Sequence, residues 1–359
     1  MRTRLTDLFS LKYPIVQAPM AGVSTPALAA QVCAAGGLGM VAIGAMDADP
    51  ADGALAQTMA ATNRPFGANV FVHPTPVRDA AVEHAWCDAL RPAFAEFAAE
   101  PPTKLDEIYR SFNDDDDMLD VLLSRRPAVV SFHFGAPSKE RARALKRYGA
   151  TLLGSATSVA EARALVDVGI DVVVAQGLEA GGHHGPFLAT GGAAVGTFAL
   201  VRQIVQAVDV PVLAAGGIAD GRGIAAALAL GAEGAQLGTA FVTATESLAS
   251  ADYRRKLTSG VPLATALTSA VSGRAARGIP GRLFPMLEAI VAKVPAYPVA
   301  YDATKRLIAA ATRAGVPDLA VQWAGQGAGL NRELPAAELV ELLGTELEAE
   351  LTRLGQLVS

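Results

Sequence analysis

The 359-residue chain has few cysteines, few charges and no long apolar run. Its two cysteines, Cys33 and Cys87, lack metal-ligand or redox spacing, which excludes a disulfide framework and fits a reducing, intracellular setting. Only 18% of the residues are charged, and 30 basic against 35 acidic side chains exclude a broad cationic surface for nucleic acid. No apolar run reaches the roughly 18 residues of a membrane span, and the first residues lack a signal core. We therefore expect a soluble cytoplasmic protein that binds neither nucleic acid nor membrane.

Apolar residues make up 51% of the chain, which provides material for a large core. Short, nearly continuous apolar runs alternate with alanine-rich helical patterns, as in a parallel sheet covered on both faces. Their number predicts an α/β fold, a (β/α)8 TIM barrel, with a doubly wound open sheet as the alternative. The eight expected strands are Pro14–Met20, Leu38–Gly44, Phe66–Val72, Ala128–Gly135, Thr151–Ser155, Asp171–Gln176, Pro211–Ala215 and Gly234–Leu237.

The chain divides into three expected regions, according to whether the alternation of apolar runs and helical patterns continues or stops. Residues 1–245 form the expected barrel, with a helical insertion at about 74–126 in which the acidic run Asp114–Asp117 caps a helix rather than binding calcium. Residues 246–322 have a purely helical pattern and are expected to form a substrate-binding domain over the barrel mouth, with helices at Ser247–Lys256, Pro262–Leu267 and Arg282–Ala292. Residues 323–359 end in an amphipathic helix, Glu333–Leu357, that we expect to pack back on the barrel.

Glycine-rich segments end the last two expected strands and predict a phosphate site. Gly216 and Gly217 follow the seventh strand, and Gln236, Leu237, Gly238 and Thr239 end the eighth. In barrel enzymes these two loops bind phosphate, because glycine lets backbone amides approach the oxygens. Turns that need glycine only for shape are the alternative. The dinucleotide fingerprint and the Walker motif are both absent, which disfavours those nucleotide sites.

Polar residues at other strand ends suit a flavin ring. Ala18, Pro19 and Met20 close the first strand, Asn69 lies in the third, and Gln176 ends the sixth. Carboxamides and backbone edges match the alternating donors and acceptors of an isoalloxazine ring. Ordinary satisfaction of buried backbone groups is the alternative for the two amides.

Among five histidines, His183 is the expected catalytic residue, because it lies in a glycine-rich loop beyond the sixth strand. An imidazole there can donate a hydrogen bond to a nitro group or act as a base. The neighbouring His184 remains a competing choice, and His133 at the end of the fourth strand is either a pocket residue or a core histidine. We expect no metal site and treat His73 and His84 as incidental.

The set of motifs in this order is similar to that of the nitronate monooxygenase family, formerly called 2-nitropropane dioxygenases, and its Ser-Phe-His-Phe-Gly motif resembles the class I enzymes. The resemblance rests on Gln17–Met20, Ser131–Gly135, Glu179–Gly185, Ala215–Gly223, Gln236–Thr239 and Ala324–Gly327, and it covers nearly the whole chain. It implies FMN on a barrel with an added helical substrate domain. FMN contacts carried over by motif are Asn69, Gln176, Gly181, Gly217 and Gln236–Thr239.

The resemblance also implies the reaction, which is oxidation of alkyl nitronates by O2 to a carbonyl compound with release of nitrite or nitrate. Propionate 3-nitronate is the expected substrate, and Tyr109, Tyr297, Tyr301 and Lys305 are the implied substrate-pocket residues. Tyrosine hydroxyls and an ammonium suit a carboxylate, whereas packing tyrosines and a solvated lysine are the alternative. An FMN-dependent reductase that uses NADH or NADPH on an enoyl thioester or a quinone, a non-catalytic flavin sensor, and a flavin-free barrel for a sugar phosphate stay open. The oligomeric state is not predicted.

Overall fold

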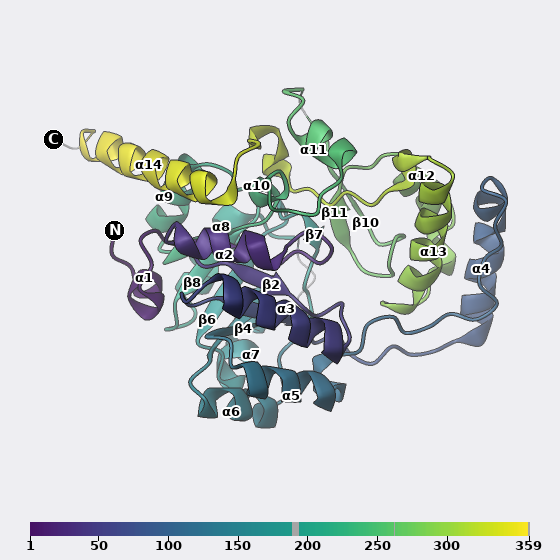
Figure 1. The fold of residues 1–359 in the computed structure, drawn as a ribbon, viewed down its shortest axis with the longest axis horizontal. Helices are drawn as coiled ribbons and strands as arrows, with labels where there is room; N and C mark the ends of the chain where they lie inside the picture. The colour runs from purple at the N-terminus through teal and green to yellow at the C-terminus, as the bar shows by residue number, and fades with distance from the viewer. Residues whose placement is uncertain (189–193, 262, 358–359) are drawn as a thin grey trace.

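The structure is a computed structural model that describes residues 1–188, 194–261 and 263–357 (Figure 1). Eight parallel strands follow one another in the order β1-β9-β8-β6-β5-β4-β3-β2. A bridge from Val16 to Leu38, just before β2, joins the two ends of this order, and it closes the barrel and rules out the open sheet. The strands are β1 (Ile15–Gln17), β2 (Met40–Ala42), β3 (Gly67–Phe71), β4 (Val129–His133), β5 (Thr151–Ala156), β6 (Val172–Gln176), β8 (Val212–Ala215) and β9 (Gly234–Leu237).

Helices surround this barrel, and their ends show why they form where they do. Thr25 accepts a hydrogen bond from the amide of Leu28 and Pro26 takes the first helical position, which starts the first surrounding helix. Gly169 ends another helix with φ 104°, in the left-handed region that favours glycine. The surrounding helices are α2 (Pro26–Ala34), α3 (Ala48–Ala61), α5 (Asp116–Arg125), α6 (Lys139–Arg147), α7 (Val159–Val168), α8 (Thr197–Val205) and α9 (Gly221–Ala229).

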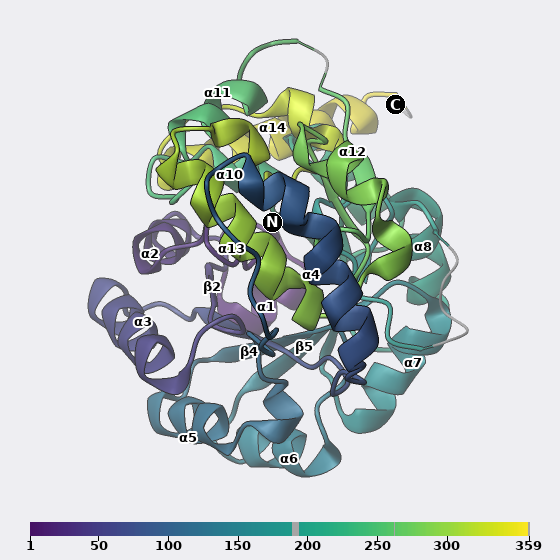
Figure 2. The same cartoon turned by 90° about the vertical axis from the view of Figure 1, so that its right-hand side faces the viewer.

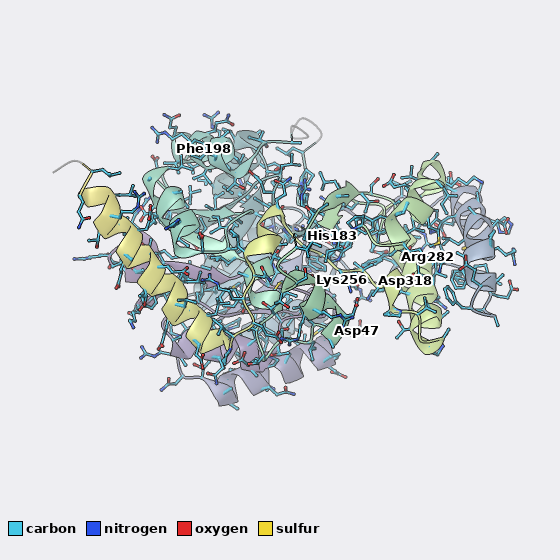
Figure 3. The ribbon with its side chains drawn as sticks, turned by 90° about the horizontal axis from the view of Figure 1, so that it is seen from above. Asp47, His183, Phe198, Lys256, Arg282 and Asp318 are labelled. Carbon is cyan, nitrogen blue, oxygen red and sulfur yellow. The ribbon has the colours of Figure 1, made fainter. Side chains whose placement is uncertain are left out.

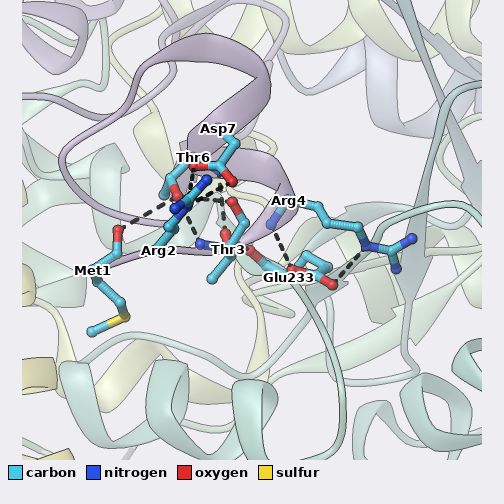
Figure 4. Close-up of polar contacts among 7 residues, drawn as sticks. All are labelled: Met1, Arg2, Thr3, Arg4, Thr6, Asp7 and Glu233. Atoms are coloured by element: carbon cyan, nitrogen blue, oxygen red, sulfur yellow. Dashed lines mark hydrogen bonds and ion pairs between the residues drawn. The ribbon is translucent and has the colours of Figure 1, made fainter.

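The half of the barrel interior near the N-terminal ends of the strands is apolar, and the N-terminal helix α1 (Arg4–Phe9) closes it. Leu5 and Phe9 of α1 pack with inward side chains such as Val129 and Leu213. Thr3 Oγ1 donates to the carbonyl of Glu233, and the Glu233 carboxylate accepts from the amide and the guanidinium of Arg4, each at 2.8 Å (Figure 4). The N-terminal ends of the strands are therefore plugged, and only the C-terminal rim is left for a ligand.

The C-terminal helix α14 (Ala336–Gly355) packs between α9 and α2, where a regular barrel has its eighth helix. Leu339, Leu343 and Leu347 form its buried stripe. The short helix α10 (Thr239–Val242) directly follows β9 and leaves this place free. The chain thus completes the barrel with a helix that begins almost a hundred residues after its last strand.

A second lobe lies over the C-terminal rim, with α4 and α13 in front of the strands in Figure 2. It consists of α4 (Ala80–Ala95), α12 (Leu283–Glu288), α13 (Val299–Arg313) and an antiparallel sheet of β10 (Ala266–Thr268), β11 (Ala276–Gly278) and β7 (Gly182–His183). Helix α11 (Ala251–Leu257) and the short 3-10 helices η1 (Phe112–Asp114), η2 (Val291–Lys293), η3 (Pro317–Leu319) and η4 (Gln326–Leu330) complete the elements.

The expectation of a purely helical segment at 246–322 is wrong, because β10 and β11 lie within it. The helix expected at Pro262–Leu267 fails because Ala266 begins β10, while residue 262 lies outside the described part of the chain. Of these short strands, β11 pairs with β10 on one side and with β7, which is distant in the sequence, on the other, so local composition does not reveal them.

The insertion after β3 is divided between the two parts of the molecule. Trp86, Leu90 and Phe94 of α4 pack into the core of the second lobe, whereas α5 packs against α3 and α6 on the barrel. Asp115 accepts from the amide of Met118 at 3.0 Å, which confirms that the acidic run caps a helix. Among the described residues no helix has both the length and the apolar character needed to cross a membrane.

Candidate active site at the barrel mouth

Polar side chains point inward at the C-terminal ends of the strands. In β3 and β4 the alternation places Val70 and Phe132 in the core under the helices, so Asn69 and Ser131 face the barrel interior. Asn69 Nδ2 donates to Ser131 Oγ at 2.8 Å. The apolar interior of the barrel lies on the N-terminal side of Asn69 and Ser131. These two side chains therefore line the bottom of a polar opening at the C-terminal rim and do not belong to the apolar core.

The backbone at His183 is held by two side chains from strand ends. Its carbonyl oxygen accepts from His133 Nε2 at 3.0 Å and from Gln176 Nε2 at 3.1 Å. Gln176 Oε1 accepts in turn from the amide of Gly185 at 2.9 Å. His133 must therefore carry its proton on Nε2, and the pKa of His133 is lowered to about 4, first by burial.

The imidazole of His183 lies between the barrel and the second lobe (Figure 3). Its Nε2 is 2.8 Å from Ser272 Oγ, which is fully buried beside β11. Its ring centre is 5.1 Å from that of Trp323 and 5.6 Å from that of Tyr297. Burial, helped by His133 and Arg274, lowers the pKa of His183 to about 3, so the ring is neutral at neutral pH.

His184 points away from this centre. Its Nε2 donates to the carbonyl of Ala180 at 3.0 Å, and its side chain is buried in the loop. Of the two adjacent histidines, His183 is the one that joins the aromatic side chains at the mouth.

Three tyrosines and a lysine lie on the lobe side of His183. The ring centre of Tyr109 is 6.4 Å from that of Tyr297 and 6.2 Å from that of Tyr301, and all three tyrosines are buried. Burial raises the pKa of each hydroxyl, so all three remain protonated hydrogen-bond donors. Lys305 Nζ lies 5.0 Å from the Tyr109 ring centre and 5.4 Å from that of Tyr301. The structure thus brings together the four residues implied for the substrate pocket.

The glycine loops at the ends of β8 and β9 leave backbone donors unused. Gly216 and Gly217 have φ of 115° and 75°, and a Cβ on Gly216 would lie 2.8 Å from the amide nitrogen of Ala180. Within the described chain, the amides of Gly217, Gly238 and Thr239 donate to no protein acceptor. Free amides beside a short helix start suit an anionic group such as a phosphate.

Comparison with known proteins points to one family. The model of the nitronate monooxygenase family matches residues 2–346. The chain is 52% identical over 349 residues to a nitronate monooxygenase of Pseudomonas aeruginosa, covering 97% of this chain and 99% of that protein. The chain belongs to the nitronate monooxygenase family. It is therefore an oxidoreductase of a flavin-dependent family.

Two solved structures are similar to this member of the nitronate monooxygenase family over nearly its whole length. A nitroalkane oxidase from Streptomyces ansochromogenes has a TM-score of 0.87 at 43% identity, covering 98% of this chain and 99% of the other. FabK from Thermotoga maritima has a TM-score of 0.77 at 31% identity, covering 99% of both chains. In both cases the structural similarity includes the barrel and the second lobe.

The residues expected to bind the family's cofactor lie on one rim, with one difference. Ala18–Met20 follow β1, Asn69, Gln176 and Gln236 lie in strands, and the glycines at 181, 216, 217 and 238 lie in the loops after β6, β8 and β9. Leu237 differs, because its side chain packs outward with α2, α9 and α14 and its carbonyl accepts from the amide of Ala18. A contact between Leu237 and the cofactor would therefore use its backbone, since its side chain alternates with that of the inward-facing Gln236.

Three residues around His183 escaped the sequence analysis, namely Ser272, Arg274 and Trp323. Ser272 and Arg274 lie in the turn between β10 and β11, beside Gly273 with φ 82°. The Ser-Gly pair is a turn signal that could have revealed this hairpin. Trp323 has no such signal, because its place depends on the fold of the lobe around it.

Proposed function

We propose that this chain is an FMN-dependent nitronate monooxygenase. It oxidises alkyl nitronates, propionate 3-nitronate first among them, with O2 to a carbonyl compound and nitrite or nitrate. The observation that carries the proposal is the position of His183, a neutral imidazole at the C-terminal rim of the barrel. Its ring centre lies 5.6 Å from that of Tyr297 and 5.9 Å from that of Tyr301, and Tyr109 and Lys305 lie beside these tyrosines.

The residues on the rim fit FMN. The free amides of Gly217, Gly238 and Thr239 would hold the phosphate, and Asn69, Gln176 and the backbone at Ala18–Met20 would border the ring. Bound FMN would supply the electron transfer between nitronate and oxygen. The chain supplies binding, orientation and exclusion of water.

The low pKa of His183 favours a nitronate over a neutral nitroalkane as substrate. A base with a pKa of about 3 removes a carbon-bound proton poorly at neutral pH, whereas a nitronate arrives already deprotonated. Ser272 Oγ has two acceptors for its one proton, the carbonyl of Arg274 at 3.3 Å and His183 Nε2 at 2.8 Å. When the proton is donated to Nε2, the ring proton of His183 lies on Nδ1 and can be donated to an anionic nitro oxygen. His183 then orients the substrate through this hydrogen bond.

Lys305 and the tyrosine hydroxyls would bind the carboxylate of propionate 3-nitronate. Lys305 is exposed at the edge of the tyrosines and has no ion pair within the described residues. An ammonium with protonated hydroxyls beside it suits a carboxylate. An alkyl nitronate without a carboxylate would use only the inner part of this pocket.

Absorption spectra and oxygen uptake test the proposal together. The purified protein should show flavin bands, and it should consume O2 with propionate 3-nitronate much faster than with 3-nitropropionate, whose nitro end is uncharged. His183→Asn should abolish this uptake while the flavin stays bound. A colourless protein that takes up no FMN contradicts the cofactor, and equal rates with both substrate forms contradict the chemistry.

The alternative function is an FMN-dependent reductase, which the 31% identity to FabK keeps in view. Anaerobic mixing with NADH or NADPH decides between them, because rapid bleaching of the flavin favours the reductase. A flavin sensor would bind the cofactor and show neither turnover nor bleaching.

A further inference from the structure

Arg274 lies next to the site and has no role in the proposed reaction so far. Its guanidinium carbon is 4.4 Å from the ring centre of Phe134, a residue whose ring meets that of His183 edge-on at 5.8 Å. Arg274 Nε donates to the carbonyl of His184 at 3.3 Å, and Nη2 donates to the carbonyl of Pro186. The side chain is therefore fixed against the loop that presents His183.

The charge of Arg274 is not neutralised by the protein. Within the described residues it forms no ion pair, and its Nη1 has no hydrogen-bond partner. The carboxylate that acts on it through space is Glu161, which is already saturated by Thr157 and by the amides of Phe187 and Leu188. A half-buried cation of this kind gains from an anion that the protein itself does not provide.

Arg274 and Lys305 contact opposite ends of a continuous series of aromatic rings. The series runs from Arg274 over Phe134, then to Tyr297 at 5.1 Å and Tyr109 at 6.4 Å, and ends at Lys305, 5.0 Å from Tyr109. His183 touches the inner half of the series through Phe134 and Tyr297. One cation is thus beside the imidazole, and the other is exposed at the outer edge.

From this arrangement we infer that Arg274 binds the anionic nitro end of the substrate, at the opposite end of the ring series from Lys305. The inference rests on the proposed function and extends it to a residue outside the family motifs quoted above. A nitronate is planar and shares its charge between two oxygens, which suits the remaining donors of a guanidinium. His183 Nδ1 and Arg274 Nη1 would then share that end, while the carboxylate stays near solvent at Lys305.

Nitrate, a planar monoanion, serves as a probe of the inner end without turnover. The flavin-loaded protein is titrated anaerobically with nitrate, and the shift of the flavin absorption gives the dissociation constant. Arg274→Gln, which keeps an N–H donor but loses the charge, should weaken nitrate binding about 10- to 100-fold. Arg274→Lys, which keeps the charge but loses the forked donors, should weaken nitrate binding less than Arg274→Gln does, and Lys305→Met should have the smallest effect of the three.

Oxygen uptake with two nitronates then assigns each end. Lys305→Met should raise KM for propionate 3-nitronate about tenfold or more and raise KM for ethyl nitronate much less, because only the first has a carboxylate. Arg274→Gln should lower kcat/KM for both, since both have the nitro end.

Three results would each overturn the inference. In the first, Arg274→Gln leaves nitrate binding unchanged. In the second, Arg274→Lys and Arg274→Gln lose the same affinity for nitrate, and in the third the protein without substitutions does not bind nitrate. Equal loss means that Arg274 only holds the loop through its two carbonyl bonds. The nitrate titration does not depend on turnover, so nitrate binding without any nitronate oxidation refutes the proposed function alone.

Discussion

The imidazole of His133 donates a hydrogen bond from Nε2 to the carbonyl oxygen of His183, 3.0 Å away. This bond links the end of β4 to the loop that presents the proposed catalytic ring. Because Gln176 shares the same carbonyl, the position of His183 depends on two strands of the barrel and not on the loop alone. The predictions below start from this dependence.

Replacing His133 with phenylalanine removes the donor and keeps a ring of similar bulk. We expect kcat for propionate 3-nitronate to fall about tenfold, the loss of one buried hydrogen bond, with flavin content unchanged. His84→Phe is the matched control, since His84 is exposed on α4 and, within the described part of the chain, its polar contact is with Asp88. Equal rates in the two variants would contradict the role assigned to His133.

Ser272→Ala tests whether the hydroxyl sets the proton position on His183. We expect kcat to fall about tenfold, because without the hydroxyl the ring is free to place its proton on either nitrogen. In a His183→Asn background the same change should have no further effect on residual turnover. Additive losses in steady-state rates would show that Ser272 acts only on folding of the hairpin.

Stability should fall as the pH drops from about 6 to about 4. His133 and His183 have folded-state pKa values lowered to about 4 and about 3, so the unfolded chain binds more protons in this window. Each histidine should add a slope of about 1.4 kcal/mol per pH unit to the free energy of unfolding. Urea unfolding of His133→Phe should show a slope smaller by about that amount, and an unchanged slope would refute the lowered pKa of His133.

Two glycines in α14 give a matched pair for its packing on the barrel. A Cβ on Gly344 would lie 2.2 Å from the ring of Tyr13, whereas one on Gly355 would meet nothing within 4 Å. Gly344→Ala should lower the free energy of unfolding by about 1–3 kcal/mol or more, and Gly355→Ala should leave it equal or slightly higher. Thermal melts compare them, and similar effects would mean that α14 is not seated on Tyr13 as described.

The barrel was predictable because its strands are nearly continuous apolar runs with glycine or proline at their ends, as in Asp171–Gln176 and Pro211–Ala215. Polar residues such as Asn69 and Gln176 could be placed because strand ends of a barrel meet at one rim. The strands β10 and β11 were not predictable, since strands of three residues have no readable period, and the Ser-Gly pair between them indicates only the turn.

The side chains around His183 could not be predicted from local sequence patterns, for a related reason. Trp323 and Ser272 reach it from segments far along the chain, and neither lies in a motif with a chemical meaning of its own. Likewise, Trp86 packs with residues near 300 because α4 leaves the barrel, which the helical pattern of the insertion did not indicate.

The division of the insertion after β3 has a consequence for engineering. The second lobe, which covers the barrel mouth, is built from two stretches of chain, α4 and the region around α12 and α13. Most of the barrel lies between these two stretches in the sequence. To transfer the substrate preference of a relative, both stretches must be exchanged together. If only one were exchanged, it would pack against a stretch from a different protein across the buried interface between them. The second lobe is thus joined to the barrel through two separate parts of the chain, and such a double connection restricts movement of the lobe more than a single one would.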